Sequence, residues 1–149
     1  MIWLQQKGFN ASGIDSSKLA VQMAQKKSRK VEVDCTFYML DFFNDTIPGS
    51  PFDFIFDRGC FHHAPEPETL KRFAENISRN LKEGGLWLTL TGSCDETRDG
   101  SGPPQLSAQQ IVNAVEPFFE ILSLISGHFD SNQRVAAKCW VCLVRKRKK

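Results

Sequence analysis

Two consecutive apolar segments of the chain each end on an aspartate, and a helical pattern separates them. The stretch "GID" ends at Asp15 and the stretch "MLD" ends at Asp41. Strands that alternate with helices predict a mostly parallel sheet, because parallel strands need a crossover connection between them. Open sheets of this kind bind ligands outside the carboxyl ends of their strands. We therefore expect both carboxylates at one edge of a Rossmann-like α/β sheet.

The first helices are marked by residues that commonly begin or end them. Residues 3–7 predict the last turns of a helix, which Gly8 closes. A short strand is then expected over residues 9–15. Ser16 or Ser17 is expected to cap the helix that follows this strand.

The clearest helical pattern lies between residues 65 and 85. Pro67 suits its first turn, and Gly84 is expected to close it. The segments "FDFIFD" and "LWLTLT" on either side predict strands. Residues three and four positions apart give the helix its apolar face, and these are Leu70, Phe73, Ile77 and Leu81.

The C-terminal third predicts one more helix and two strands. Ser107 and Gln110 form a capping-box pattern at the start of a helix expected over residues 107–119. The segments "FEILSLIS" and "VAAKCWVCLVR" are joined by a short turn-like link, which predicts an antiparallel hairpin. The expected fold is a mostly parallel sheet with one antiparallel strand near its end.

Length and charge limit the classes of protein that this chain can be. A chain of 149 residues can bury one core, so we expect a single domain over residues 1–149. A net charge of +2 gives no field favouring nucleic acid or a membrane surface, and no apolar run is long enough to span a bilayer. The basic run 145–149 is expected to be a solvated tail, with binding of an acidic partner as the alternative.

The five cysteines predict a reducing environment and no metal site. They are odd in number and accompany no secretory signal pattern, so we expect reduced thiols and a cytoplasmic location. The stretch "CFHH" at residues 60–63 lacks the usual spacing of zinc ligands. Cys139 and Cys142 lie three positions apart in a strand pattern, which directs their side chains to opposite faces.

A third strand also ends in polar residues, in the stretch "FDFIFDRGCFHHAP". Asp57, Arg58 and Gly59 are expected at the same sheet edge, where Arg58 can hold a carboxylate by paired hydrogen bonds. The alternative is a structural salt bridge between Arg58 and either Asp57 or Asp53.

Two roles are open for the aspartates that end the first two strands. Asp15 can accept hydrogen bonds from both ribose hydroxyls of a nucleotide, and Asp41 can accept one from an adenine amino group. The alternative is that each aspartate merely caps the turn that follows it.

The order and spacing of four motifs resemble one enzyme family. The stretches "GFNASGIDSS", "MLDFF", "FDFIFDRGCFHHAPE" and "LKEGGLWLTLTG" together resemble the class I S-adenosylmethionine-dependent methyltransferases. Within this class, "FDFIFDRG" is most similar to the thiopurine and tellurite-resistance methyltransferases. The resemblance implies methyl transfer from S-adenosylmethionine to a small-molecule acceptor, such as a thiol or a thiopurine.

The resemblance also implies which residues form the site. In-line transfer from an activated sulfonium mainly requires alignment and exclusion of water, so no catalytic residue is assigned. His62 or His63 can act as a base where the acceptor must lose a proton, although a positioning role is favoured. Residues implied to bind the cofactor are Asp15, Ser16, Asp41, Phe42 and Asp57, and those implied to lie near the acceptor are Arg58, Phe61 and His62.

The family pattern normally begins with a strand and a Gly-rich turn, and two residues ahead of Trp3 cannot supply them. An N-terminally truncated domain with weakened cofactor binding is therefore expected. The missing strand would lie between the "ASGI" and "FDFIF" strands and would leave an unpaired edge on each of them. Three outcomes are open: the two strands pair directly, a second copy of the chain fills the gap, or the sequence is part of a longer protein that supplies the strand. Two other functions stay open: a non-catalytic, self-associating Rossmann-like interaction domain, and a fragment of an NAD-dependent oxidoreductase.

Overall fold

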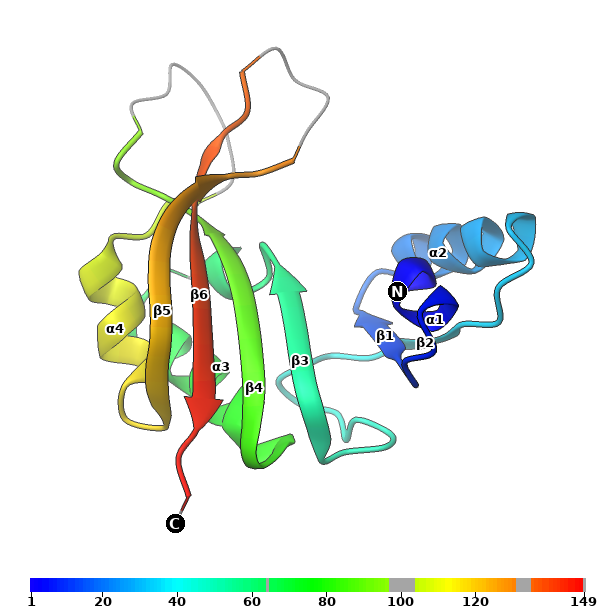
Figure 1. The fold of residues 1–149 in the computed structure, drawn as a ribbon, viewed down its shortest axis with the longest axis horizontal. Coiled ribbons are helices and arrows are strands. Elements are labelled where there is room, and N and C mark those ends of the chain that lie inside the picture. Colours follow the sequence, from blue (N-terminus) through cyan, green and yellow to red (C-terminus); the bar gives the residue numbers. More distant parts are fainter. Residues whose placement is uncertain (64, 97–103, 131–134, 149) are drawn as a thin grey trace. The chain divides into compact units, whose positions relative to one another are not determined.

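A computed structural model describes residues 1–63, 65–96, 104–130 and 135–148. Backbone contacts group the chain into two compact units (Figure 1), and the expected single domain over residues 1–149 stays a prediction. Unit 1 comprises Met1–Pro48 and unit 2 comprises Gly49–Lys149.

Unit 1 is a parallel pair of strands with two helices. Its elements are α1 (Ile2–Gln6), β1 (Ser12–Asp15), α2 (Lys18–Lys30) and β2 (Thr36–Met39). The strands pair in parallel, with Asp15 opposite Met39. Gly8 adopts a φ of +83° just after α1, and the Ser17 hydroxyl accepts a hydrogen bond from the Ala20 N–H at 3.3 Å. Both helix boundaries agree with the prediction.

Unit 2 is a four-stranded sheet covered by helices on one face. Its elements are β3 (Phe52–Arg58), η1 (Phe61–His63), α3 (Pro67–Arg79), β4 (Leu81–Gly92), α4 (Ala108–Val115), β5 (Phe119–His128) and β6 (Lys138–Lys146). The strand order is β3-β4-β6-β5. β3 and β4 are parallel, whereas β6 is antiparallel to both of its neighbours. The predicted α/β class, parallel pairing and antiparallel C-terminal hairpin are confirmed.

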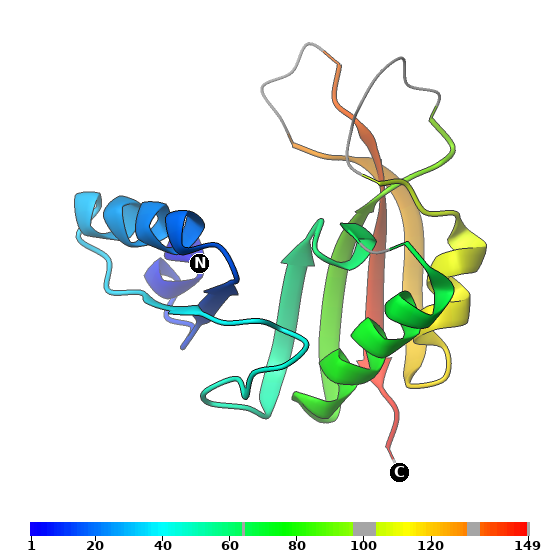
Figure 2. The same ribbon diagram turned by 180° about the vertical axis from the view of Figure 1, so that it is seen from behind.

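The core of unit 2 lies between the sheet and the helices α3 and α4, which cover the same face (Figures 1 and 2). Trp87 of β4 has no exposed surface and stands at its centre. Its ring centroid lies 5.1 Å from that of Phe61, 6.0 Å from that of Phe73 and 5.6 Å from that of Phe119. Burial of aromatic side chains of this size supplies much of the stability of a small core.

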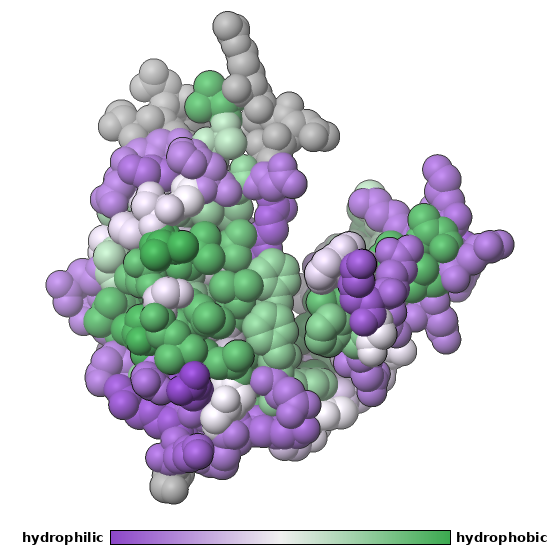
Figure 3. Space-filling view, viewed as in Figure 1, coloured by the Kyte–Doolittle hydropathy of each residue, from purple (hydrophilic) through white to green (hydrophobic). Residues whose placement is uncertain are grey.

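The opposite face of this sheet carries large apolar side chains that remain partly exposed, and Figure 3 shows the apolar surface that they form. Phe54 and Phe56 of β3 are 44% and 48% exposed, and Ile125 of β5 is 57% exposed. Phe54 and Phe56 are paired with Leu86 and Leu88 of β4, so apolar side chains continue across neighbouring strands.

The third helix ends earlier than the sequence predicted. α3 stops at Arg79, and the expected closing residue Gly84 instead lies within β4 with a φ of +72°. Asn80 explains the difference. Its side-chain amide donates to the Asn76 carbonyl at 2.9 Å, while its backbone carbonyl accepts from the Phe52 N–H at 2.8 Å. The backbone thus passes directly from the helix into the sheet.

The C-terminal segments also differ from their predicted limits. α4 ends at Val115 rather than near residue 119, because Pro117 follows it and disfavours helical continuation. The basic run that was expected to form a tail from residue 145 begins inside β6, which reaches Lys146. Two of its arginines form ion pairs, Arg145 with Glu120 at 3.4 Å and Arg147 with Glu116 at 2.8 Å.

Candidate functional site

The carboxyl ends of β1 and β2, which we call the tip of unit 1, bring Asp15 and Asp41 together. The Leu40 N–H donates to the Asp15 carbonyl at 3.1 Å, so the backbone before Asp41 runs beside Asp15. Both aspartates are exposed. Two neighbouring parallel strands therefore end in solvent-facing carboxylates, as strand-end positions in this kind of sheet predict.

Asp15 also orders the turn into α2. One of its oxygens, Oδ1, accepts a hydrogen bond from the Ser17 N–H at 2.8 Å. Ser16, which was predicted to bind the cofactor, is exposed between them. A carboxylate offers about four acceptor positions, so this single bond leaves Asp15 able to accept from a ligand as well. The turn-capping and ligand-binding roles are therefore compatible.

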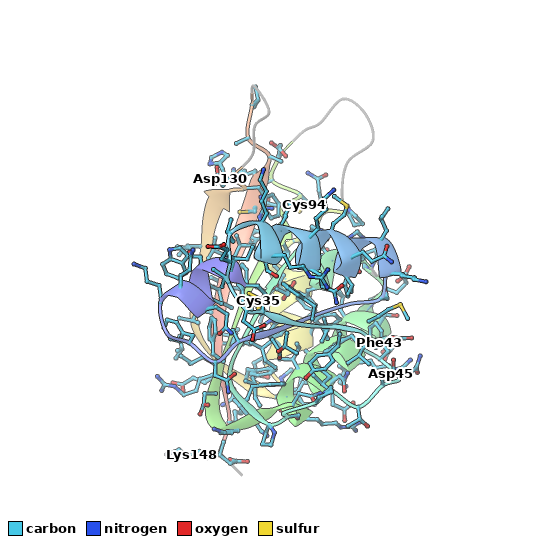
Figure 4. The ribbon with its side chains drawn as sticks, turned by 90° about the vertical axis from the view of Figure 1, so that its right-hand side faces the viewer. Cys35, Phe43, Asp45, Cys94, Asp130 and Lys148 are labelled. Carbon is cyan, nitrogen blue, oxygen red and sulfur yellow. The ribbon has the colours of Figure 1, made fainter. Side chains whose placement is uncertain are left out.

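Asp41 organises the loop that follows β2. Its Oδ1 accepts from the Phe43 N–H at 2.9 Å, and its Oδ2 accepts from the Asn44 side-chain amide at 2.7 Å. Its own N–H donates to Asp45 Oδ2 at 2.7 Å. Phe42 lies edge-on to Phe43, with ring centroids 5.7 Å apart. Figure 4 labels Phe43 and Asp45 in this loop. These bonds fix the loop that presents Asp41 and Phe42.

The carboxyl ends of β3, β4 and β5 form the tip of unit 2, since these three strands run in the same direction. Asp130 and Cys94, which follow β5 and β4, lie at this end of the sheet (Figure 4). The predicted residues Asp57, Arg58 and His62 lie in or just after β3 at the same end.

Asp57 points into the interior of unit 2. Its Oδ2 accepts from the Trp87 indole N–H at 2.9 Å, and its Oδ1 accepts from the Cys60 and Phe61 N–H groups at 3.1 and 3.2 Å. Burial raises the pKa of this carboxyl above 3.8 despite these donors. The bonds give Asp57 a structural role at the turn where Gly59 adopts a φ of +94°. Its predicted contact with a cofactor stays a prediction.

Two further predicted residues follow that turn. Phe61 is 1% exposed and packs against Phe73 and Trp87, so the structure gives its ring a core position rather than an open one. His62 is 2% exposed, and its Nδ1 accepts from the Gly92 N–H at 2.6 Å. This bond requires an unprotonated Nδ1, which places the proton of the neutral ring on Nε2.

Arg58 is exposed and is held by residues that follow β5. One terminal nitrogen, Nη2, donates to the Asp130 carbonyl, and the guanidinium carbon lies 5.4 Å from the centroid of the Phe129 ring. The salt bridge considered as an alternative would use Asp57 or Asp53. Asp53 instead pairs with Lys82 at 2.8 Å. No local sequence pattern indicates Phe129, because its contact with Arg58 joins segments far apart in the chain.

No metal site is found among the described residues, since they contain no group of three His, Cys, Asp or Glu side chains placed to hold an ion. Cys139 and Cys142 are both buried, and burial raises the pKa of Cys142 to about 12. Within the described ranges, every helix is too short or too polar to cross a membrane.

Residues 1–85 match a protein family described as "Methyltransferase domain". A curated relative, "Probable thiol methyltransferase 2" from Arabidopsis thaliana, is 34% identical over 116 residues. The match covers 76% of this chain and 50% of that protein, so the chain spans half the length of the relative.

Two solved structures described as SAM-dependent methyltransferases are also similar. One, from Methanosarcina mazei, has a TM-score of 0.81 at 16% identity, and the match covers 99% of this chain and 86% of the Methanosarcina chain. The other, from Clostridium acetobutylicum, has a TM-score of 0.74 at 18% identity, and the match covers 97% of this chain and 78% of the Clostridium chain. At such low identity these likenesses concern the fold alone.

Proposed function

The chain belongs to the methyltransferase domain family, and from this premise we propose that it binds S-adenosylmethionine and transfers the methyl group to a small-molecule acceptor. The observation that carries the proposal is the shared position of Asp15 and Asp41 at the tip of unit 1. An aliphatic or aromatic thiol is the favoured acceptor, because the relative at 34% identity is described as a probable thiol methyltransferase. A cytoplasmic location is part of the proposal and rests on the odd number of cysteines.

The hydrogen-bond acceptors at this tip fit the nucleoside part of the cofactor. Carboxylate oxygens accept hydrogen bonds, and the adenosine moiety presents ribose hydroxyls and an amino group that donate them. Asp15 would accept from the hydroxyls, with Ser16 beside it, and Asp41 would accept from the amino group, with Phe42 against the ring. The loop bonds of Asp41 reduce the ordering cost of binding, because they hold its backbone in place beforehand.

The acceptor side of the proposal rests on the tip of unit 2. When bound, S-adenosylmethionine supplies a methyl group on a positively charged sulfur. Arg58 would orient an acceptor that carries a carboxylate, and His62 would support the adjoining turn through Gly92. Asp57 would face the cofactor while it holds the turn after β3, and Phe61 would support the acceptor side from its core position. Since alignment is the main requirement of the transfer, no side chain is assigned as a base.

Calorimetry with S-adenosylhomocysteine tests the cofactor part. Loss of a hydrogen bond to a charged group costs about 1.5–3 kcal/mol, so Asp15→Asn and Asp41→Asn should each weaken binding by about 10- to 150-fold. Asp34→Asn is the matched control, because Asp34 is an exposed aspartate just ahead of β2, at the strand end opposite Asp41. Equal affinities for all four proteins would refute the assignment. Transfer of a labelled methyl group to a thiol then tests the reaction itself.

A further inference from the structure

The guanidinium of Arg58 is held on two sides by the segment that follows β5. The Phe129 ring lies 5.4 Å from its central carbon, which is within cation–π range. The Asp130 carbonyl accepts a hydrogen bond from Nη2. Arg58 ends the parallel strand β3, whereas these partners follow an antiparallel hairpin strand, so the contact ties together two edges of the tip of unit 2.

Phe129 is itself fixed through its backbone and through its ring. Its backbone N–H donates to the Ala137 carbonyl at 2.8 Å, which extends the pairing of β5 and β6 by one more bond. Its ring centroid lies 6.3 Å from that of His62, with the two planes at 71°. Because His62 is buried and bonded to Gly92, Phe129 packs against a side chain that is already immobilised.

The charge of Arg58 also influences a buried thiol of the same unit. Cys139 of β6 pairs with Gly92 of β4 and has no exposed surface. Burial raises the pKa of the Cys139 thiol, and the positive charge of Arg58 opposes this shift. The positive charge of Arg58 is therefore felt at a buried group of β6 as well as by its two partners after β5.

We infer that Phe129 is a positioning residue that holds the Arg58 guanidinium over the tip of unit 2 and thereby prepares it to bind a carboxylate on the methyl acceptor. This inference rests on the proposed function, which it deepens by naming an anionic acceptor. A guanidinium has five N–H donors in a fixed plane, and the bond to Asp130 uses one of them. The others can form the paired hydrogen bonds that a carboxylate accepts.

Nuclear magnetic resonance of the full chain tests the inference without requiring turnover. The Arg58 Nε–H signal, identified by its loss in Arg58→Lys, should be shifted by the ring current of Phe129. The shift should disappear in Phe129→Leu and persist in Phe129→Tyr, which keeps the ring. Circular dichroism of both variants checks that they fold. An unshifted wild-type signal would overturn the inference.

Titration with two thiols of similar size tests what Arg58 binds. Mercaptoacetate carries a carboxylate and 2-mercaptoethanol does not, so only the former should move the Arg58 signal. Phe129→Leu should weaken mercaptoacetate binding about 3- to 10-fold, and Phe129→Tyr should restore it. Equal responses to both thiols, or equal affinities in wild type and Phe129→Leu, would contradict the inference. Calorimetry with S-adenosylhomocysteine reports separately on the proposed function, because its readout concerns Asp15 and Asp41.

Discussion

Asp57 shows how a single residue can serve the structure where a ligand contact was expected. Its carboxylate accepts from Trp87 and from two backbone N–H groups, and an asparagine in its place would direct an amide N–H toward one of these donors. A buried donor left without an acceptor costs about 1–3 kcal/mol. Asp57→Asn should therefore lower the free energy of unfolding by about that amount at neutral pH.

The pH dependence of this effect follows from the raised pKa of Asp57. The unfolded chain releases the proton near 3.8, whereas the folded protein retains it to a higher pH. The stability that wild-type Asp57 contributes therefore falls as the pH rises from about 3.8 to the higher pKa of the folded protein. Asp57→Asn has no carboxyl at this position, so its stability lacks this pH dependence. The difference between their free energies of unfolding, measured by urea titration, should therefore shrink from about pH 4 upward. A constant difference would contradict the raised pKa, and Asp53→Asn, an exposed residue, serves as the control.

Residue positions set by strand ends could be predicted, whereas side-chain directions could not. Asp15 and Asp41 lie at one tip because parallel pairing of β1 and β2 fixes where both strands end. The bond between Asp57 and Trp87 depends on the register of β3 against β4, which no local pattern specifies. The contact of Arg58 with Phe129 depends on two strand pairings beyond that.

At the scale of elements, the helix beginning at Ala108 has the most complete cap among the helices that the structure describes. The Ser107 hydroxyl accepts from the Gln110 N–H at 3.2 Å, and the Gln110 side chain accepts from the Ser107 N–H at 2.9 Å. Ser107→Ala should lower the free energy of unfolding by about 1 kcal/mol, because one helix N–H loses its acceptor. Ser107→Thr retains a hydroxyl and should be nearly neutral in the same urea titration. Equal stability of Ser107→Ala and wild type would show that the cap contributes nothing.

Helix starts were predicted more closely than helix ends. Ser17, Pro67 and Ser107 stand at or beside observed starts, because caps and first-turn prolines act through local bonds. The end of α3 was misjudged, since Gly84 marks a plausible stop by composition but Asn80 is already bonded to β3. Tertiary pairing therefore overrode a local signal.

For the whole molecule, the two units differ greatly in how much apolar surface they bury. Unit 1 contains two of the buried hydrophobic residues found among the described positions, Val21 and Ile47. All the others lie in unit 2, and they are Phe61, Leu70, Phe73, Ala74, Ile77, Leu81, Trp87, Leu106, Ile111, Ala114, Val115, Phe119, Cys139, Cys142 and Val144. Since apolar burial is the main favourable term in folding, unit 1 should open at lower free energy than unit 2.

Native-state hydrogen exchange should reveal this difference and connect it to binding. Amides of β1 and β2 should exchange faster than those of β4 and β6, because local opening of unit 1 requires less apolar surface to be exposed. A ligand held by Asp15 and Asp41 binds only the closed form of unit 1. S-adenosylhomocysteine at about 100 times its dissociation constant should then slow exchange in β1 and β2 by about 100-fold, or about 2.7 kcal/mol. Asp15→Asn should reduce this slowing at the same ligand concentration, whereas slowing confined to β4 and β6 would place the ligand on unit 2 and contradict the assignment.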